Sequence, residues 1–174
     1  ALNLSQMSGG LTATGSIGVG AAVNDITAVT RANILDSVVE AGLQVVLEAD
    51  GQSQIEALTM GGAGAATISQ GTAFTFAGAG AGSGNNIRST LEAAIEDRID
   101  GNGGTRVQSA GSVSLRADDR ATITANAGAI AIVLGLTQGS TNINVSIGVS
   151  AAVNNITSTV SAHLTDATIT AGRD

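Results

Sequence analysis

The sequence contains no cysteine, proline, lysine, tryptophan or tyrosine, and it holds only two phenylalanines. Without cysteine there is no disulfide framework, no thiolate metal site and no cysteine nucleophile. Aromatic residues make up 1% of the chain, which leaves almost no surface on which sugars or bases could stack. The absence of proline favours a chain of hydrogen-bonded strands, because proline removes a donor from the strand ladder.

Charge is also scarce and of predominantly one sign. Seven arginines stand against 14 acidic residues, the formal net charge is −7 and the pI is near 4.4. This balance repels phosphate backbones and argues against nucleic-acid binding. Hydrophobic residues reach 43% and charged residues only 12%, which argues against intrinsic disorder. The most apolar run, residues 127–136, is shorter than the ~20 residues of a membrane helix, so we expect no membrane insertion.

Internal repetition is the strongest signal in the chain. Residues 16–27 read SIGVGAAVNDIT and residues 146–157 read SIGVSAAVNNIT, an offset of 146 − 16 = 130. A weaker copy lies between them, where Asn85 follows Asn24 by 85 − 24 = 61 and precedes Asn154 by 154 − 85 = 69. We predict repeat copies over about 16–76, 77–145 and a partial copy over 146–174. The difference of eight between the offsets indicates an insertion over 98–105.

Comparison of the copies predicts which side chains point inward. Alanine recurs at 32, 93 and 162, whereas the preceding position holds Arg31, Glu92 and Ser161. Fixed apolar residues at every second position, with free variation between them, are typical of a strand with one buried face. The segment 87–98 contains good helix formers and is the place where a helix competes. The equivalent segments are rich in β-branched residues, so we predict a strand there too.

The predicted fold is an all-β, right-handed parallel β-solenoid that runs continuously over residues 1–174. Each repeat has room for three coils of about 20 residues, or for fewer and wider coils. Residues 1–24, 57–87 and 121–165 hold no Asp, Glu or Arg, which predicts strands covered on both faces. Strand positions such as Gly18 and Gly20 are tiny in every copy, so we expect them to pack closely against another sheet or chain.

The element SIGVxAAVNxIT, with VTAG and VSLxADDxATITA, resembles the tandem repeats of very large bacterial surface proteins of the filamentous-haemagglutinin-like and adhesin-like β-helix type. The resemblance covers essentially the whole chain and lies in the composition and residue pattern of the repeat. It implies a secreted, right-handed parallel β-helix that acts as a stalk, fibre or adhesive surface. No binding-site motif is carried over.

Three parts of the sequence could form a site, and each also has a simpler structural interpretation. Residues 100–104, beside Asp97, could hold calcium, although Asp-Gly and Asn-Gly also form ordinary turns. His163 is the only histidine, and any serine hydrolase would have to use it with Asp166, but its copies Asn33 and Ala94 indicate a freely varying surface position. Thr-x-Thr pairs at 12/14, 122/124, 157/159 and 168/170 could bind ice, although β-propensity also explains them.

The sequence therefore predicts a structural protein and assigns no catalytic, cofactor-binding or metal-ligating residue. Its carboxylates are spread along turns and no groove of acids and bases is indicated, so we expect no enzyme activity. We expect an extracellular or cell-surface location, with further copies of the same repeat as partners, in the same chain or stacked end to end. The alternative is a discrete calcium- or ice-binding module.

Overall fold

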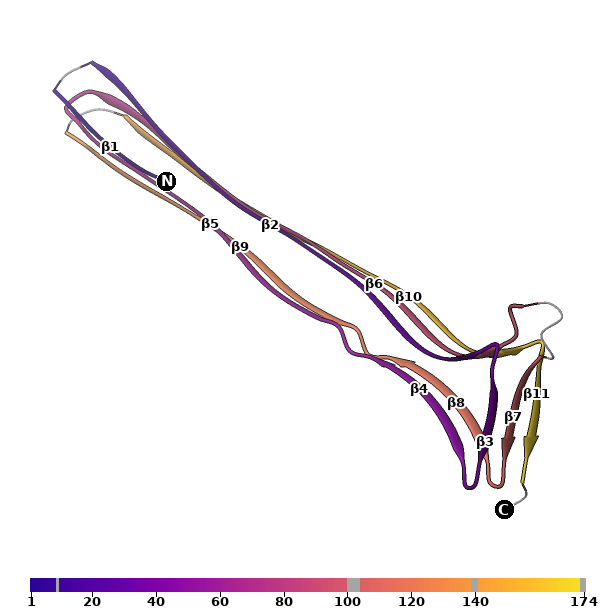
Figure 1. Cartoon of the computed structure of the whole chain (residues 1–174). Coiled ribbons are helices and arrows are strands. Elements are labelled where there is room, and N and C mark those ends of the chain that lie inside the picture. The colour runs from indigo at the N-terminus through magenta and orange to yellow at the C-terminus, as the bar shows by residue number, and fades with distance from the viewer. Residues whose placement is uncertain (9, 100–103, 139–140, 173–174) are drawn as a thin grey trace. The chain divides into compact units, whose positions relative to one another are not determined.

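Every secondary-structure element in the described part of the chain is a β-strand (Figure 1). The structure is a computed structural model and describes residues 1–8, 10–99, 104–138 and 141–172. The strands are β1 Leu2–Met7, β2 Leu11–Leu35, β3 Val38–Ala41, β4 Val45–Gly51, β5 Gln54–Ser69, β6 Thr72–Glu96, β7 Thr105–Ser109, β8 Val113–Asp119, β9 Thr122–Thr137, β10 Asn142–Thr165 and β11 Ala167–Ala171. Strand β6 includes residues 87–96 of the segment in which a helix competed, so the strand prediction is confirmed there, and the strand ends before Asp97.

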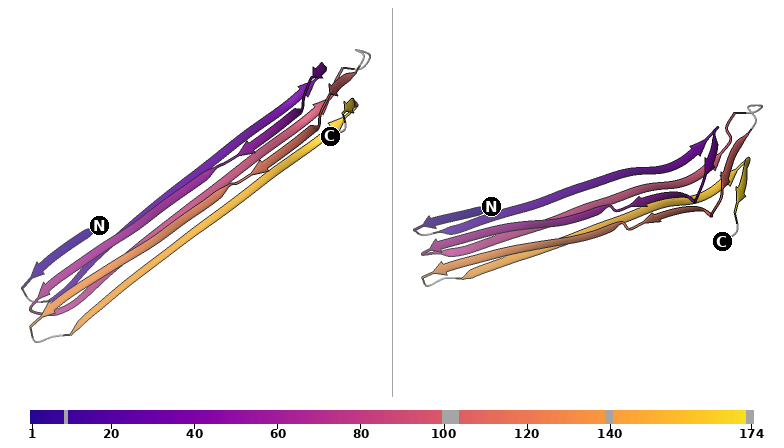
Figure 2. Two further views of the ribbon diagram at one scale, coloured as in Figure 1. Left: turned by 90° about the horizontal axis from the view of Figure 1, so that it is seen from below. Right: turned by 60° about the horizontal axis from the view of Figure 1, so that its bottom comes forward.

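The strands form four parallel sheets in the orders β1-β5-β9, β10-β6-β2, β11-β7-β3 and β4-β8. Each strand pairs with the equivalent strand of the preceding coil, as Figure 2 shows. Leu2 pairs with Gly64 and Val38 with Arg106, offsets of 64 − 2 = 62 and 106 − 38 = 68. The predicted all-β parallel solenoid is therefore confirmed, and each repeat is one wide coil rather than three short ones.

The predicted insertion lies between β6 and β7. The coil offset is 85 − 24 = 61 before it and 106 − 38 = 68 after it, a gain of seven residues. Asp36, Gly104 and Asp166 then share one register and all have a left-handed backbone, with φ of 48°, 79° and 52°. Asp and Gly are among the residues that tolerate this conformation best. Residues 100–103 of the insertion lie outside the described residues.

The chain divides into two compact units, and unit 1 comprises Ala1–Asn24, Ile55–Asn85 and Ile123–Asn154. In unit 1, the sheet β1-β5-β9 faces the parts of β2, β6 and β10 that belong to this unit. The facing side chains are small, and Ala63, Ala65, Ala77 and Ala79 form a buried cluster. A methyl group added at Gly18 would overlap the carbonyl group of Gly62. The predicted close packing of the tiny-residue faces is therefore confirmed in the first two copies, whereas Gly148, Ser150 and Ala152 of the third copy are exposed.

Hydroxyl groups fill another part of the interior of unit 1. Thr75 donates to Thr67 at 3.0 Å, and Thr12 and Ser69 lie 3.3 Å apart. All four side chains are buried. These four side chains fit between closely spaced sheets, and each hydroxyl has a partner on the facing strand, which avoids the cost of an unpaired buried polar atom. The buried hydroxyls of Ser16, Thr59 and Ser83 have no such partner among the described residues.

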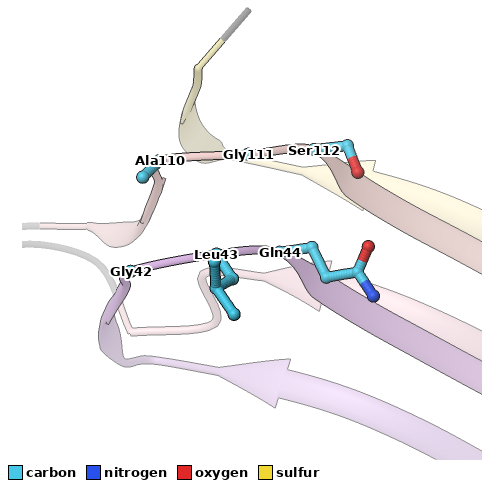
Figure 3. A pocket seen from close by; sticks show the side chains of 6 residues that line it. All are labelled: Gly42, Leu43, Gln44, Ala110, Gly111 and Ser112. Carbon is cyan, nitrogen blue, oxygen red and sulfur yellow. The ribbon is translucent and has the colours of Figure 1, made fainter. Parts of the chain in front are cut away.

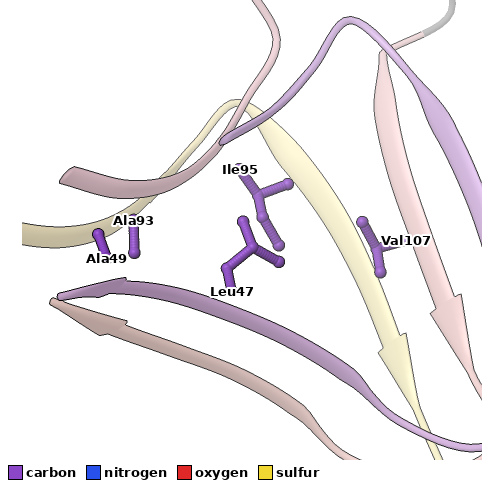
Figure 4. Close-up of a cluster of buried hydrophobic side chains, with 5 residues drawn as sticks. All are labelled: Leu47, Ala49, Ala93, Ile95 and Val107. Carbon is purple, nitrogen blue, oxygen red and sulfur yellow. The ribbon is translucent and has the colours of Figure 1, made fainter. Parts of the chain in front are cut away.

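Unit 2 comprises Asp25–Gln54, Asn86–Thr122 and Asn155–Asp174, and it encloses a conventional apolar core. The core residues Leu47, Ala49, Ala93, Ile95 and Val107 come from β4, β6 and β7 and point toward one another (Figure 4). Within this unit, parts of β2, β6 and β10 form one side, β3, β7 and β11 a second, and β4 and β8 a third. Ile95 and Val107 are fully buried, so large apolar side chains fill the interior of unit 2, although others such as Val29, Val38 and Leu43 are exposed.

The predicted alternation holds in the first two copies and is wrong in the third. Ala32 is half-buried beside the exposed Arg31, and Ala93 is buried beside the half-buried Glu92. Ala162 is exposed, however, and its neighbour Ser161 is half-buried. The physical reason is that β4 and β8 pair only with each other, so no described strand of this third sheet covers the last coil.

The close approach of the two sheets in unit 1 yields a first prediction. Gly18→Ala should lower the free energy of unfolding by about 1–3 kcal/mol, because the added methyl group meets backbone that no rotamer change can move. Gly15 lies on the same strand with open space around its Cβ direction. Gly15→Ala should be neutral or stabilising by up to ~1 kcal/mol. Urea unfolding of both variants checks this, and an equal effect would contradict the packing.

Candidate functional site

Two ladders of amide side chains connect successive coils. In unit 1, Asn24 donates to Asn85 at 2.8 Å, and Asn85 donates to Asn154 at 2.9 Å. In-register parallel pairing brings equivalent positions side by side, so an asparagine repeated in each copy forms a continuous row. Asn85, in the middle of this row, is only 3% exposed and has both its amide oxygen and its amide nitrogen bonded. We call this row the inner ladder.

The outer ladder lies in unit 2, one residue further along each strand. Asn86 donates to Asp25 at 3.1 Å, and Asn155 donates to Asn86 at 2.9 Å. Its direction is opposite to that of the inner ladder, because here each coil donates to the coil before it. Arg88 adds a bond of 3.1 Å to the carboxylate of Asp25.

Ion pairs also join neighbouring coils in unit 2. Arg31 lies 2.9 Å from Glu92, and Arg116 lies 3.7 Å from Glu48. Exposed pairs of this kind add little to stability. They do favour one alignment on β4 and β8, because a shift of two residues would place Glu48 beside Asp118 instead of Arg116.

The exposed surface position that the repeat comparison predicted for His163 is wrong, since His163 and its equivalent Asn33 are half-buried and its equivalent Ala94 is fully buried. The side chain of His163 is 36% exposed, Nε2 lies 2.7 Å from Glu96 and Nδ1 lies 2.8 Å from Ser161. Arg98 first, and then His163, hold the pKa of Glu96 below its ordinary value through hydrogen bonds. Asp166, which the hydrolase interpretation required, is not among these partners. An offset of 69 places His163 beside Ala94, and Glu96 lies two residues further along the same strand and on the same face. The sequence signal that could have revealed this contact is therefore the repeat offset, extended to residues two positions away.

Glu92, Glu96 and His163 offer three ligand atoms within 4.8 Å of one another. Such a group could hold a divalent cation. Both carboxylates already have cationic partners, however, since Arg31 binds Glu92 and Arg98 binds Glu96. The arrangement therefore serves as a network of polar contacts that joins the second coil to the first through Arg31 and Glu92, and to the third through Glu96 and His163.

The remaining candidate residues do not come together. Asp97 is described, but residues 100–103 of the proposed calcium loop are outside the described part of the chain. Thr12 and Thr14 are buried, and the other three threonine pairs lie on β9, β10 and β11 in three different sheets. The described threonine pairs thus form no flat array of the kind that ice binding requires.

A cavity of about 390 Å³ lies in unit 2, where the β3–β4 turn meets the β7–β8 turn (Figure 3). Leu43 and Gln44 line it from one coil, and Ser112 lines it from the next. The residues around it include no titratable side chain. The cavity is a gap between stacked turns and provides no acid, base or nucleophile.

Both ends of the stack present open strand edges. In the described residues, β1, β2, β3 and β4 have a partner on one side only, and so do β8, β9, β10 and β11. Thr141 and Thr165 accept hydrogen bonds from Ala73 and Asp97, so alternate backbone groups of β10 point toward β6. The intervening groups point to the open edge, where they can pair with another strand.

The outer faces of unit 1 are unusually apolar. Ile17 and Val19 on β2 are 68% and 77% exposed, and Leu134 and Leu136 on β9 are 64% and 68% exposed. Glu56 is the one acidic or basic side chain in the unit's sequence. The prediction that the uncharged strands are covered on both faces is therefore wrong within this chain: the tiny residues are covered, and the large apolar residues are not.

Comparison with protein-family models, with curated proteins and with solved structures finds no match to this chain. Within the described residues, no helix has the length and apolar character needed to cross a membrane.

The inner ladder yields a second prediction. Asn85→Ala should lower the free energy of unfolding by about 1–3 kcal/mol, because it leaves the amide nitrogen of Asn24 and the amide oxygen of Asn154 unpaired. Asn155→Ala removes one exposed bond at the end of the outer ladder and should change stability by no more than ~0.5 kcal/mol. Urea unfolding distinguishes the two, and a larger effect at Asn155 would refute the role of the inner ladder.

The lowered pKa of Glu96 yields a third prediction. A depressed carboxyl pKa gives stability that is present above the unfolded-state pKa and is lost as the pH falls through the folded-state pKa. The parent should therefore melt at a higher temperature than Glu96→Gln at pH 7. The difference should shrink once the pH falls below the ordinary glutamate pKa of about 4.3, and it should disappear below the lowered pKa of Glu96 in the folded chain. Glu40→Gln, at an exposed position on β3, is the control and should show no such change. A difference that persists unchanged at pH 3 would count against the network.

Proposed function

We propose that this chain is a structural segment of an extracellular fibre or surface adhesin that elongates by stacking its coils end to end. The observation that carries the proposal is that the two ends of the inner ladder are complementary. Among the described residues, the amide nitrogen of Asn154 donates to no partner, and the amide oxygen of Asn24 accepts from none. A coil stacked on the last strand can therefore continue the row in the same direction.

The strands at the two ends also support this proposal, because they are nearly identical. Residues 16–27 on β2 and 146–157 on β10 differ at only two positions, Gly20 against Ser150 and Asp25 against Asn155. Strand β10, at the open end of this sheet, is therefore nearly identical in sequence to β2, which pairs with the opposite edge of β6. Further coils, from the same chain or from another copy, would satisfy the open backbone groups at both edges. The extracellular location rests on the resemblance to adhesin-like repeats.

Asn154→Asp is the sharpest test of end-to-end stacking. An aspartate oxygen can still accept from Asn85, but it replaces the free amide donor with a carboxylate facing the oxygen of Asn24 in the next copy. We expect the parent to form filaments in a concentration-dependent manner in sedimentation and electron microscopy. The variant should need about a tenfold higher concentration, which corresponds to the loss of a hydrogen bond of about 1.4 kcal/mol.

Asn126→Asp is the matched control. It makes the same chemical change at an exposed position on β9, away from both ladders, and should assemble like the parent. A parent chain that stays monomeric at every concentration at which it is folded would overturn the proposal, as would equal assembly of Asn154→Asp and the parent.

A further inference from the structure

The outer face of the β10-β6-β2 sheet in unit 1 has a surface relief that repeats from strand to strand. The middle strand β6 presents Gly78 and Gly80 outward, while Ile17 on β2 and Ile147 on β10 stand on either side. These residues, with Phe76 and Ala79, line a shallow groove of about 280 Å³. The outer strands are thus two apolar ridges, and the middle strand is the floor between them.

The groove continues along β6 beyond this pocket. A methyl group at Gly80 would touch the side chain of Val19 at 3.8 Å, and one at Gly82 would reach the carbonyl of Ala151 at 4.0 Å. The two ridges are therefore separated by two strand spacings, about 9.6 Å. Val149 and Val153 continue the β10 ridge and are 64% and 68% exposed.

We infer that this face is a lateral interface for a second copy of the same chain, an inference that rests on the proposed fibre function. Each ridge lies one strand spacing from the floor of the groove, and the two ridges lie two strand spacings apart. Two such faces turned toward each other and offset by one strand can therefore each place a ridge in the other's groove. A two-fold axis along the strands makes this contact mutual, as in symmetric dimers.

The area of the face agrees with a weak contact of this kind. Residues 11–24 of β2 number 24 − 11 + 1 = 14, so the face is about 46 Å long and three strands, or about 14 Å, wide. Faces offset by one strand overlap over two of these three strands, so together they bury roughly 900 Å², which is below the range of standard specific interfaces. A single chain should therefore pair weakly, and stacked coils should pair more strongly as the face lengthens.

A second copy fits this face better than a lipid bilayer does. The open edges of β2 and β10 would leave backbone groups unpaired in hydrocarbon, which is costly. The sequence of unit 1 also holds no tryptophan, tyrosine, arginine or lysine, the residues that anchor proteins at the membrane interface. The lack of charge equally removes any electrostatic penalty for bringing two copies together.

Matched valines on one strand test the inference. Val19→Glu places a charge on the ridge, whereas Val29→Glu makes the same change on β2 within unit 2, at a position that is also exposed, by 58%. Gly80→Val fills the groove, and its first added carbon has room beside Val19. In sedimentation and electron microscopy, Val19→Glu and Gly80→Val should weaken side-by-side pairing at least tenfold but still form single filaments. Val29→Glu should pair like the parent.

Cross-linking gives a second readout, because the natural chain has no cysteine. A Gly80→Cys chain mixed with a Val19→Cys or a Val149→Cys chain should give mixed disulfide dimers under an added oxidant. Mixing Gly80→Cys with Val29→Cys should give few. Absence of a mixed dimer with either ridge variant would overturn the inference.

The outcomes separate this inference from the proposed function. Asn154→Asp should shorten filaments while side-by-side pairs persist, whereas Val19→Glu should do the reverse. Filaments without any side-by-side pairing would reject the lateral interface alone. A parent that instead binds phosphatidylcholine–phosphatidylglycerol vesicles as a monomer, and loses that binding in Val19→Glu, would replace the second copy with a membrane.

Discussion

Parallel, in-register pairing between coils is the constraint on which the rest of this structure depends. It places each residue beside its equivalent in the next coil. A residue type repeated in every copy is therefore favourable only if its side chain can interact with an identical side chain. Asparagine can do so, because it both donates and accepts. Charges cannot, and Arg31 accordingly lies beside Glu92. Where Asp50 and Asp118 do share a register, Arg116 and Arg120 bind Asp118 and hold its pKa low.

The same pairing supports two different interiors. In unit 2, Leu47, Ile95 and Val107 fill the space between three sheets and provide ordinary hydrophobic burial. In unit 1, Ala, Gly, Ser and Thr let two sheets approach closely, so close contact between backbones replaces the burial of large side chains. Most large apolar residues of unit 1 then lie outside, although Ile55 is buried. They form an exposed apolar surface, and burying it against a partner would be favourable.

Much of this could be predicted from the sequence, since the repeats act as an internal alignment. Alternation at Ala32 and Ala93 indicated strands and their buried faces, and the tiny residues indicated a close approach at Gly18. Coil width could not be predicted, because an offset of 61 residues suits one wide turn as well as three short ones. The bonds of His163 were missed because they are diagonal, reaching Glu96 rather than the repeat equivalent Ala94. The exposed ridges were missed because absence of charge does not show which face is covered.

The central claim is that the coil edges elongate by the same pairing that joins the coils within the chain. Fibre diffraction from aligned assemblies of this chain tests it most directly. The account predicts a meridional reflection near 4.8 Å, because the strands would lie across the fibre axis at the spacing of a β-sheet. Fibres in which the reflection near 4.8 Å is equatorial would contradict it, since their strands would run along the axis and the coils would not be stacked through their edges.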